Sequence, residues 1–279
     1  MKKTILLLII TLLGALAVQG KDNIIKSVPV AEFDRISITS SITVRYTQSS
    51  KHKCTMCTIT GTRKDVDNIK VEVKGKQLKL TVKSSERKIA GVTFNSAELT
   101  DDVVIDISSP QLHKVELIGS GDFIATTPIS TTDLTFSIAG SGDITLGRIA
   151  TTDFDLNIAG SGDIALKQLK TTNLTAKVAG SGDILIRKIA STCERASLSV
   201  AGSGDIDANF DDCRQLKCSI AGTGDITLSG KATNLTTSIV GIGDIDKSRL
   251  TVTGRHNRND VKIATHTSPA NYGKIKSRP

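Results

Sequence analysis

Residues 138–144 read Ile-Ala-Gly-Ser-Gly-Asp-Ile, and the same seven residues return in the same order at 158–164. At the centre of this stretch is the tetrad Gly-Ser-Gly-Asp, which occurs seven times in the chain with variation only at its second residue. The tetrads follow one another at steps of 21, 20, 20, 22, 20 and 19 residues, and they end at Asp122, Asp143, Asp163, Asp183, Asp205, Asp225 and Asp244. The chain therefore contains repeating units of about twenty residues.

The residues on either side of each tetrad alternate between apolar and polar. Counting back from the first glycine, the second residue is always Leu, Ile or Val, the third is polar, and the fourth is mostly apolar. The residue after the aspartate is Ile or Phe, and in most units an apolar residue stands two positions further on. A period of two predicts a β-strand with one buried face. Each unit is thus expected to form a strand, a glycine corner and a second strand.

A unit of this length cannot bury an apolar face by itself, whereas stacked units bury a continuous column. The period of two and the abundance of Thr, Ile, Ser and Gly exclude helical repeats. We therefore predict an all-β fold, a single-stranded parallel β-helix of about seven regular coils, with the seven aspartates along one line at a spacing of roughly 4.8 Å. The general preference for right-handed crossovers predicts a right-handed winding.

The first twenty residues have the pattern of a signal peptide. Lys2 and Lys3 precede an apolar stretch at 5–16, and Val18 and Gly20 stand at the usual cleavage positions. The apolar stretch is too short to span a bilayer comfortably and no second one follows, so the mature chain has no predicted transmembrane segment. We expect export to the periplasm, the outer-membrane surface or the extracellular space.

The remaining chain divides into three parts. Residues 21–110 alternate less regularly and are expected to form irregular first coils or a capping subdomain. Residues 111–250 form the regular β-helix, which is expected to stop where Lys247 replaces an apolar residue. Residues 251–279 form a basic tail, with six Lys and Arg residues against Asp260.

The composition excludes several classes of protein. A content of 38% hydrophobic and 23% charged residues excludes a disordered chain and a polytopic membrane protein. Aromatic residues make up 3% and Trp is absent, which disfavours a carbohydrate enzyme that stacks sugar rings. The net charge of +8 lies mostly in the tail, and no aromatic residues interleave with the basic ones, so nucleic-acid binding is not expected.

The column of tetrad aspartates has two interpretations. In the first, each carboxylate accepts hydrogen bonds from backbone amides at its own corner. In the second, the column binds a row of calcium ions, as glycine- and aspartate-rich β-rolls do. A single aspartate per coil provides few ligands, which favours the structural interpretation, and we expect no bound metal or other cofactor.

The cysteines differ in their position within the repeat. Cys193 and Cys213 each lie nine residues before a tetrad, so adjacent coils would stack them within disulfide reach, and export would favour oxidation. Cys218 is expected to be a buried thiol. Cys54 and Cys57 follow His52 in a pattern that resembles half a zinc site or a redox pair. On a strand the two would face opposite sides, and whether they pair is left open.

Catalysis would require unlike groups to meet where the repeat is broken. The visible breaks are His113, Arg148, Glu194-Arg195 and Asp211-Asp212, and none of them forms an identifiable acid–base pair. We therefore expect no catalytic residues. Because some enzymes that degrade polysaccharides are β-helices, a polysaccharide-active enzyme is an alternative interpretation by analogy of fold.

The sequence resembles an exported, Bacteroidetes-type family of unknown function labelled "putative auto-transporter adhesin head", or GIN domain. The resemblance rests on the segments 33–46, 69–73 and 78–80, and on 115–118 leading into the first tetrad. It implies an exported β-helical protein without an established activity. Our interpretation is a non-enzymatic, adhesin-like binding or structural protein whose partner is an extracellular glycan or an envelope protein. An envelope-structural protein with no ligand is a further alternative.

Overall fold

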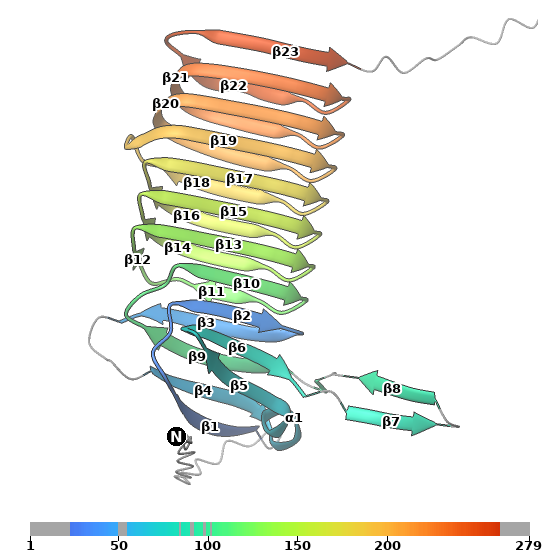
Figure 1. Cartoon of the computed structure of the whole chain (residues 1–279). Helices are drawn as coiled ribbons and strands as arrows, with labels where there is room; N and C mark the ends of the chain where they lie inside the picture. Colours follow the sequence, from blue (N-terminus) through green and yellow to red (C-terminus); the bar gives the residue numbers. More distant parts are fainter. Residues whose placement is uncertain are drawn as a thin grey trace, which may run out of the picture.

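The computed structural model of the protein describes residues 23–49, 55–83, 85–89, 92–96, 99–100 and 102–262. The predicted signal peptide at 1–20, His52, Cys54 and residues 263–279 of the predicted tail lie outside the described residues. The described chain is nearly all β-structure, wound into a β-helix of about seven turns of parallel strands (Figure 1). The predicted fold class is confirmed, and the right-handed winding stays a prediction.

Two parallel sheets run along the axis of the molecule. From the N-terminal end upward, the first sheet contains β6 (Gln77–Val82), β2 (Arg35–Thr39), β10 (Lys114–Gly119), β13 (Asp133–Gly140), β15 (Asp153–Gly160), β17 (Asn173–Gly180), β19 (Cys193–Gly202), the second halves of β20 (Ile206–Gly222) and β21 (Ile226–Gly241), and β23 (His256–Lys262). The second sheet contains β9 (Val103–Ser109), β3 (Ile42–Gln48), β11 (Phe123–Ala125), β14 (Ile144–Ala150), β16 (Ile164–Lys170), β18 (Ile184–Ile189), the first halves of β20 and β21, and β22 (Ile245–Val252). The short strand β12 (Ile129–Ser130) pairs with the end of β14.

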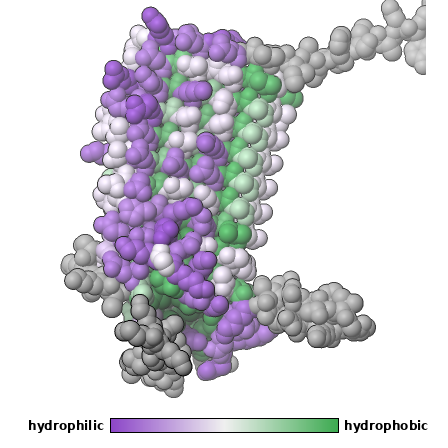
Figure 2. All heavy atoms as spheres, in the orientation of Figure 1, coloured by the Kyte–Doolittle hydropathy of each residue, from purple (hydrophilic) through white to green (hydrophobic). Residues whose placement is uncertain are grey.

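Equivalent residues of successive coils lie in register. In the first sheet Ile138 is opposite Ile158 and Gly140 is opposite Gly160, and the next coil continues the same pairing. Side chains at one position of the repeat therefore form a column parallel to the axis. Figure 2 shows the result on the surface, where polar and apolar residues are sorted into stripes along the length of the molecule.

The tetrad needs glycine at two positions because the backbones of adjacent coils meet there. Gly160 has a φ of 145°, which L side chains rarely adopt, and a Cβ atom on it would clash with the carbonyl oxygen of Gly140. A Cβ atom on Gly162 would clash with the carbonyl oxygen of Gly142. The close stacking of the corners thus explains why the tetrad retains its glycines in every coil.

The inward positions fill the interior with Ile, Leu, Val and Phe in one continuous core. Three phenylalanines contact one another inside it: the ring centroids of Phe123 and Phe136 are 5.7 Å apart in a tilted arrangement, and those of Phe136 and Phe154 are 6.1 Å apart edge to face. Tyr46 extends the stack downward, with its centroid 5.9 Å from that of Phe123. Burial of this column is the main stabilising term for units that could not fold alone.

The N-terminal end combines stacked coils with antiparallel strands. β2, β3, β6 and β9 pair in parallel, whereas β1 (Asn23–Val30) pairs antiparallel with β4 (Thr55–Thr62), and β5 (Ile69–Lys74) pairs antiparallel with β6. The short helix α1 (Arg63–Asn68) follows β4, and its N-cap Thr62 accepts a hydrogen bond from the backbone of Asp65. β7 (Ser85–Ile89) and β8 (Val92–Ser96) form a separate hairpin. The antiparallel strands and α1 lie at the lower end of the column (Figure 1).

The C-terminal end extends past Leu250, where the sequence predicts the regular coils to end. Lys247 does not stop the column, because a bulge accommodates it: Thr227 pairs with Asp246 and Ser229 with Arg249, which leaves Lys247 and Ser248 between the paired positions. β23 then adds one more strand to the first sheet. It places His256 opposite the buried Leu235 and Arg258 opposite the buried Thr237. Charged or polar residues at inward positions are a known way to discourage pairing at a sheet edge.

Candidate functional site

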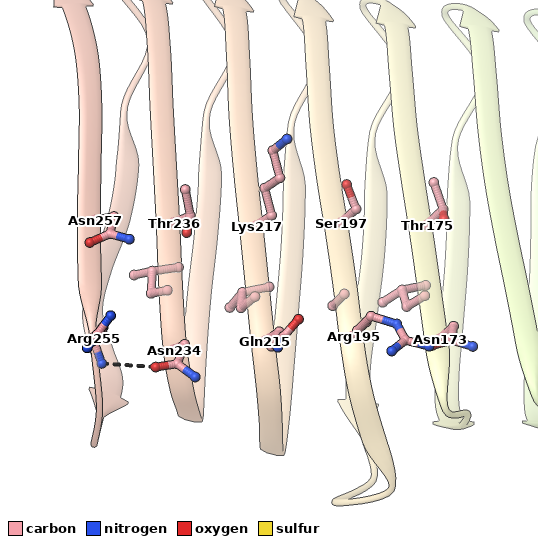
Figure 3. Close-up of a pocket in the computed structure, with 14 residues that line it drawn as sticks. Asn173, Thr175, Arg195, Ser197, Gln215, Lys217, Asn234, Thr236, Arg255 and Asn257 are labelled. Atoms are coloured by element: carbon pink, nitrogen blue, oxygen red, sulfur yellow. Dashed lines mark hydrogen bonds between the residues drawn. The ribbon is translucent and has the colours of Figure 1, made fainter.

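A groove of about 870 Å³ crosses the upper half of the first sheet. It passes over β17, β19, the second halves of β20 and β21, and the start of β23 (Figure 3). Counting back from the first glycine of each tetrad, its polar lining comes from positions −7 and −5. Within the groove, the −7 column consists of Asn173, Arg195, Gln215, Asn234 and Arg255, and the −5 column of Thr175, Ser197, Lys217, Thr236 and Asn257.

These side chains point outward because the residues between them point into the core. Leu174, Leu216 and Leu235 separate the two columns, and their exposed fractions are only 2%, 2% and 1%. The floor of the groove is therefore closed, and a ligand would contact amides, hydroxyl groups and cationic side chains. Figure 3 shows the two columns as parallel rows across neighbouring strands.

The groove is basic. Arg195, Lys217 and Arg255 line it, and its lining contains no acidic residue. All three are exposed, and none forms an ion pair with a carboxylate of the described chain. Asn234 helps to fix the upper end, because its Oδ1 accepts a hydrogen bond of 3.1 Å from the backbone nitrogen of Arg255.

The same two columns become acidic below the groove. The −7 position is Asp133 in β13 and Asp153 in β15, and the −5 position of β15 is Asp155. Asn173 marks the change, since its Nδ2 donates a hydrogen bond of 2.7 Å to Asp153 Oδ1. Two coils of negative charge thus lie beside five strands of positive and neutral groups on one sheet face.

The tetrad aspartates form a continuous ladder. The backbone nitrogen of Asp163 donates to Asp143 Oδ1 at 2.9 Å, and that of Asp183 donates to Asp163 Oδ1 at 2.8 Å. The same bond joins every consecutive pair from Asp122 to Asp244, at 2.7–3.2 Å. The backbone amide that donates to each carboxylate belongs to the next coil. Our structural interpretation, which placed the donor at the aspartate's own corner, is corrected in this detail. Calcium binding by the column stays untested, and the described residues contain no cluster of three or more potential metal ligands.

Cys193 and Cys213 lie opposite each other in β19 and β20, as the spacing predicts. Both are buried, and their sulfur atoms are 3.5 Å apart as two thiols. The hydrogen bond between them raises the pKa of Cys193 and lowers the pKa of Cys213, because the Cys193 thiol stabilises a Cys213 thiolate. The pair is therefore positioned for a disulfide, which we keep as a prediction.

Cys57 and Cys218 are buried thiols. Burial raises the pKa of the Cys57 thiol to about 12 and also raises the pKa of Cys218. Such thiols are weak nucleophiles and weak metal ligands. The pairing of Cys54 with Cys57 lies outside the described residues.

His113 is the one repeat break that approaches an acid. Its Nδ1 is 3.1 Å from Asp133 Oδ2 and 3.3 Å from Thr131 Oγ1. Because the acid and the hydroxyl contact the same ring nitrogen, the imidazole cannot relay a proton from the hydroxyl to the acid. Among the other breaks, Glu194 and Asp211 form exposed ion pairs with Arg214 and Lys188.

A parallel β-helix with a closed core and a polar groove across its coils defines a class of repeat proteins that present extended surfaces. The chain belongs to the family described as "Putative auto-transporter adhesin, head GIN domain", whose model matches residues 32–209 and 188–258. The family description names an adhesin and not an enzyme. No curated protein matches the sequence significantly.

Solved structures of similar proteins share the fold. A "putative adhesin" from Parabacteroides distasonis ATCC 8503 has a TM-score of 0.72 and 21% identity, over 87% of this chain and 97% of that chain. A "putative adhesin" from Bacteroides fragilis NCTC 9343 has a TM-score of 0.66 and 26% identity, over 81% and 97% of the two chains. A "putative lipid binding protein" from Parabacteroides distasonis ATCC 8503 has a TM-score of 0.65 and 25% identity, over 88% and 98%.

The groove residues were missed in the sequence although the signal was present. Register follows the tetrads, so counting back seven and five residues from the first glycine recovers the groove residues of β17, β19, β20 and β21. Arg255 and Asn257 follow the last tetrad, and only the pairing of β23 with β21 places them in the two columns. In the part of the chain that the structure describes, no helix is long and apolar enough to cross a membrane.

Proposed function

We propose that the protein is an exported, non-enzymatic binding protein that holds an extended polymer in the groove of the first sheet. The observation that carries the proposal is the repetition of outward polar groups at the same two positions of five neighbouring strands. Such groups recur at the strand spacing of roughly 4.8 Å, so they suit a long ligand that lies along the axis. The signal-peptide pattern and the adhesin description of the family support export and surface binding.

A glycan is the favoured polymer. A bound protein strand would pair with a free sheet edge, but the groove lies on a sheet face whose strands already pair on both sides, except at β23. A face of amide, hydroxyl and cationic groups can instead donate hydrogen bonds to the oxygens of a sugar chain. The ligand of this family member would thus be an extracellular or envelope polysaccharide.

The alternatives lack support at the groove. A glycoside hydrolase of the usual kind needs two carboxyl groups around the scissile bond, and the groove lining contains none. A lipid ligand, suggested by the description of one similar structure, needs an apolar pocket, but the leucines of the floor are closed to solvent. An envelope-structural protein without a ligand would leave three unpaired cations in one groove without a role.

Two experiments test the proposal. Cell fractionation followed by protease shaving of intact cells should place the protein outside the cytoplasm, and cleavage only after cell lysis would contradict surface exposure. Residues 21–279, purified and applied to a glycan array containing neutral and acidic polysaccharides, should bind at least one polymer. A chain found in the cytoplasm, or an array without any binding, would refute the proposed function.

A further inference from the structure

We propose that the groove selects an acidic polysaccharide, a polymer with carboxylates along its length, and that Arg195, Lys217 and Arg255 bind these carboxylates. This inference rests on the proposed function, because it names the chemical class of the polymer that the same groove would hold. It is argued from the charge, the aromatic content and the boundaries of the groove.

The charge of the groove lining is unbalanced. Arg195 and Arg255 stand three strands apart in one column, a separation of roughly 14 Å, and Lys217 lies between them in the neighbouring column. Some cations elsewhere on the described surface pair with an acid on a neighbouring strand, as Arg45 does with Asp106 at 2.8 Å, whereas no acidic residue lines the groove. Three cations without a carboxylate partner in one groove are complementary to a line of negative charges.

The groove lacks the aromatic side chains that commonly hold neutral sugars. Neutral sugars are commonly bound by stacking on exposed aromatic rings. No aromatic residue lines the groove, and Phe123, Phe136, Phe154 and Phe210 are all buried in the core. Recognition must then depend on hydrogen bonds and charge. Charge-assisted hydrogen bonds from arginine or lysine to a carboxylate are stronger than hydrogen bonds between neutral groups.

The groove ends at an acidic boundary below β17. Asp153 and Asp155 continue the two columns below the groove, and Asp155 forms no ion pair with another described residue. A polyanion would be repelled by these coils, so it would be confined to the strands between β17 and β23. A neutral polymer would meet similar hydrogen-bonding groups on both halves and would not be confined.

The test measures binding of purified residues 21–279 by isothermal titration calorimetry. The acidic probes are oligogalacturonate and hyaluronan oligosaccharides, and the matched neutral probe is oligogalacturonate with all its carboxyl groups methyl-esterified. We expect an acidic probe to bind with an affinity that falls as salt increases, and the ester to bind at least tenfold more weakly.

Variants locate the binding. The triple variant R195Q/K217Q/R255Q should lose roughly 10- to 100-fold in affinity, at roughly two- to fivefold for each exposed ion pair. The control variant K167Q/K170Q/R187Q removes the same charge from exposed positions of β16 and β18 in the second sheet, and should bind within twofold of the wild type. Asp155→Thr copies the Thr135 and Thr175 of its column and should strengthen binding of long acidic oligomers by roughly twofold.

The outcomes separate the two proposals. Tight binding of neutral glycans with no preference for acidic ones would overturn the inference and leave the proposed function standing. Equal losses in the groove variant and the control variant would overturn the inference, because net charge alone would then explain binding. Binding to vesicles of phosphatidylglycerol but to no acidic oligosaccharide would overturn it in favour of a lipid surface. No binding to any glycan would refute both.

Discussion

Replacing Asp163 tests whether the tetrad aspartates hold neighbouring coils together. Asp163 Oδ1 accepts a hydrogen bond of 2.8 Å from the backbone nitrogen of Asp183, and its own nitrogen donates to Asp143. Asp163→Ala removes the first bond and leaves the second, whereas Asp163→Asn keeps an oxygen acceptor in the same place. The pair of variants therefore separates the hydrogen bond from the charge.

The expected magnitude follows from the exposed position of the corner. A hydrogen bond to a charged group stabilises a protein by about 1.5–3 kcal/mol, but water can replace the lost acceptor at an exposed corner, so the net loss in Asp163→Ala should be about 1 kcal/mol. For a chain of this size that lowers Tm by about 2–4 °C. Asp163→Asn should remain within about 0.5 kcal/mol of the wild type, since it also relieves repulsion between stacked carboxylates.

Urea denaturation monitored by circular dichroism measures both variants, with calorimetry as a second probe because repeat proteins can unfold in more than one step. The double variant D163A/D183A should lose about twice as much, because Asp183 accepts a separate bond of 2.8 Å from Asp205. Equal stability of Asp163→Ala and Asp163→Asn would refute the ladder as a stabilising element. A rise of several degrees in the Tm of the wild type on adding calcium, lost in Asp163→Asn, would show that the column binds cations instead.

After treatment with a thiol–disulfide oxidant, the purified and then denatured protein should contain two fewer titratable thiols than the untreated protein, because Cys193 and Cys213 form a disulfide. Either Cys193→Ser or Cys213→Ser alone should abolish this loss. An unchanged thiol count in the oxidised and denatured wild type would contradict the predicted disulfide. Gly162→Ala should destabilise the protein by roughly 3 kcal/mol or more, because the added Cβ would clash with the backbone of the adjacent coil. In Gly75→Ala the added Cβ meets nothing within 4 Å, so this variant should lose only about 1 kcal/mol, because of the positive φ of 52°. Equal effects of the two glycine substitutions in urea denaturation would argue against close stacking of the corners. Burial raises the pKa of Tyr46 to about 12. The stability that its neutral form contributes is therefore complete below pH 10 and is lost as the pH rises through 12. An ultraviolet titration of the wild type, compared with that of Tyr46→Phe, should show this late ionisation, and a midpoint near pH 10 would contradict it.

The sequence predicted the β-helix because residues at the same position of each repeat stack in one column of the fold. Ile138, Ile158 and their equivalents are at most 2% exposed, and the paired cysteines face each other because a fixed spacing before the tetrad becomes a fixed place on the coil. Hydrogen bonds within the corner could not be assigned in the same way. Whether an aspartate bonds to its own coil or to the next depends on backbone direction at the corner, and the residue types alone do not specify that direction.

Local deviations from the repeat were the other limit. Lys247 occupies an inward phase by counting, so the sequence predicts the end of the column there. The bulge at Lys247 and Ser248 shifts the register of β22 by one residue, and Asp246 Oδ1 stabilises it by accepting a hydrogen bond of 2.8 Å from the nitrogen of Ser248. A one-residue shift of this kind is invisible to a rule that counts in twos, because it exchanges inward and outward positions beyond it.

The groove shows how this fold can change its ligand without changing its core. Positions −7 and −5 point outward in the coils that form the groove, so their side chains leave the packing of Leu174, Leu216 and Leu235 unaffected. The −7 column changes from Asp153 to Asn173 and then to Arg195 over two coils while the backbone register stays constant. The position of the basic face along the axis therefore depends on a few surface residues. Because each coil contacts only its neighbours, substitutions in one coil should move the boundary of the groove by about one strand spacing, roughly 4.8 Å, and leave the remaining coils unchanged.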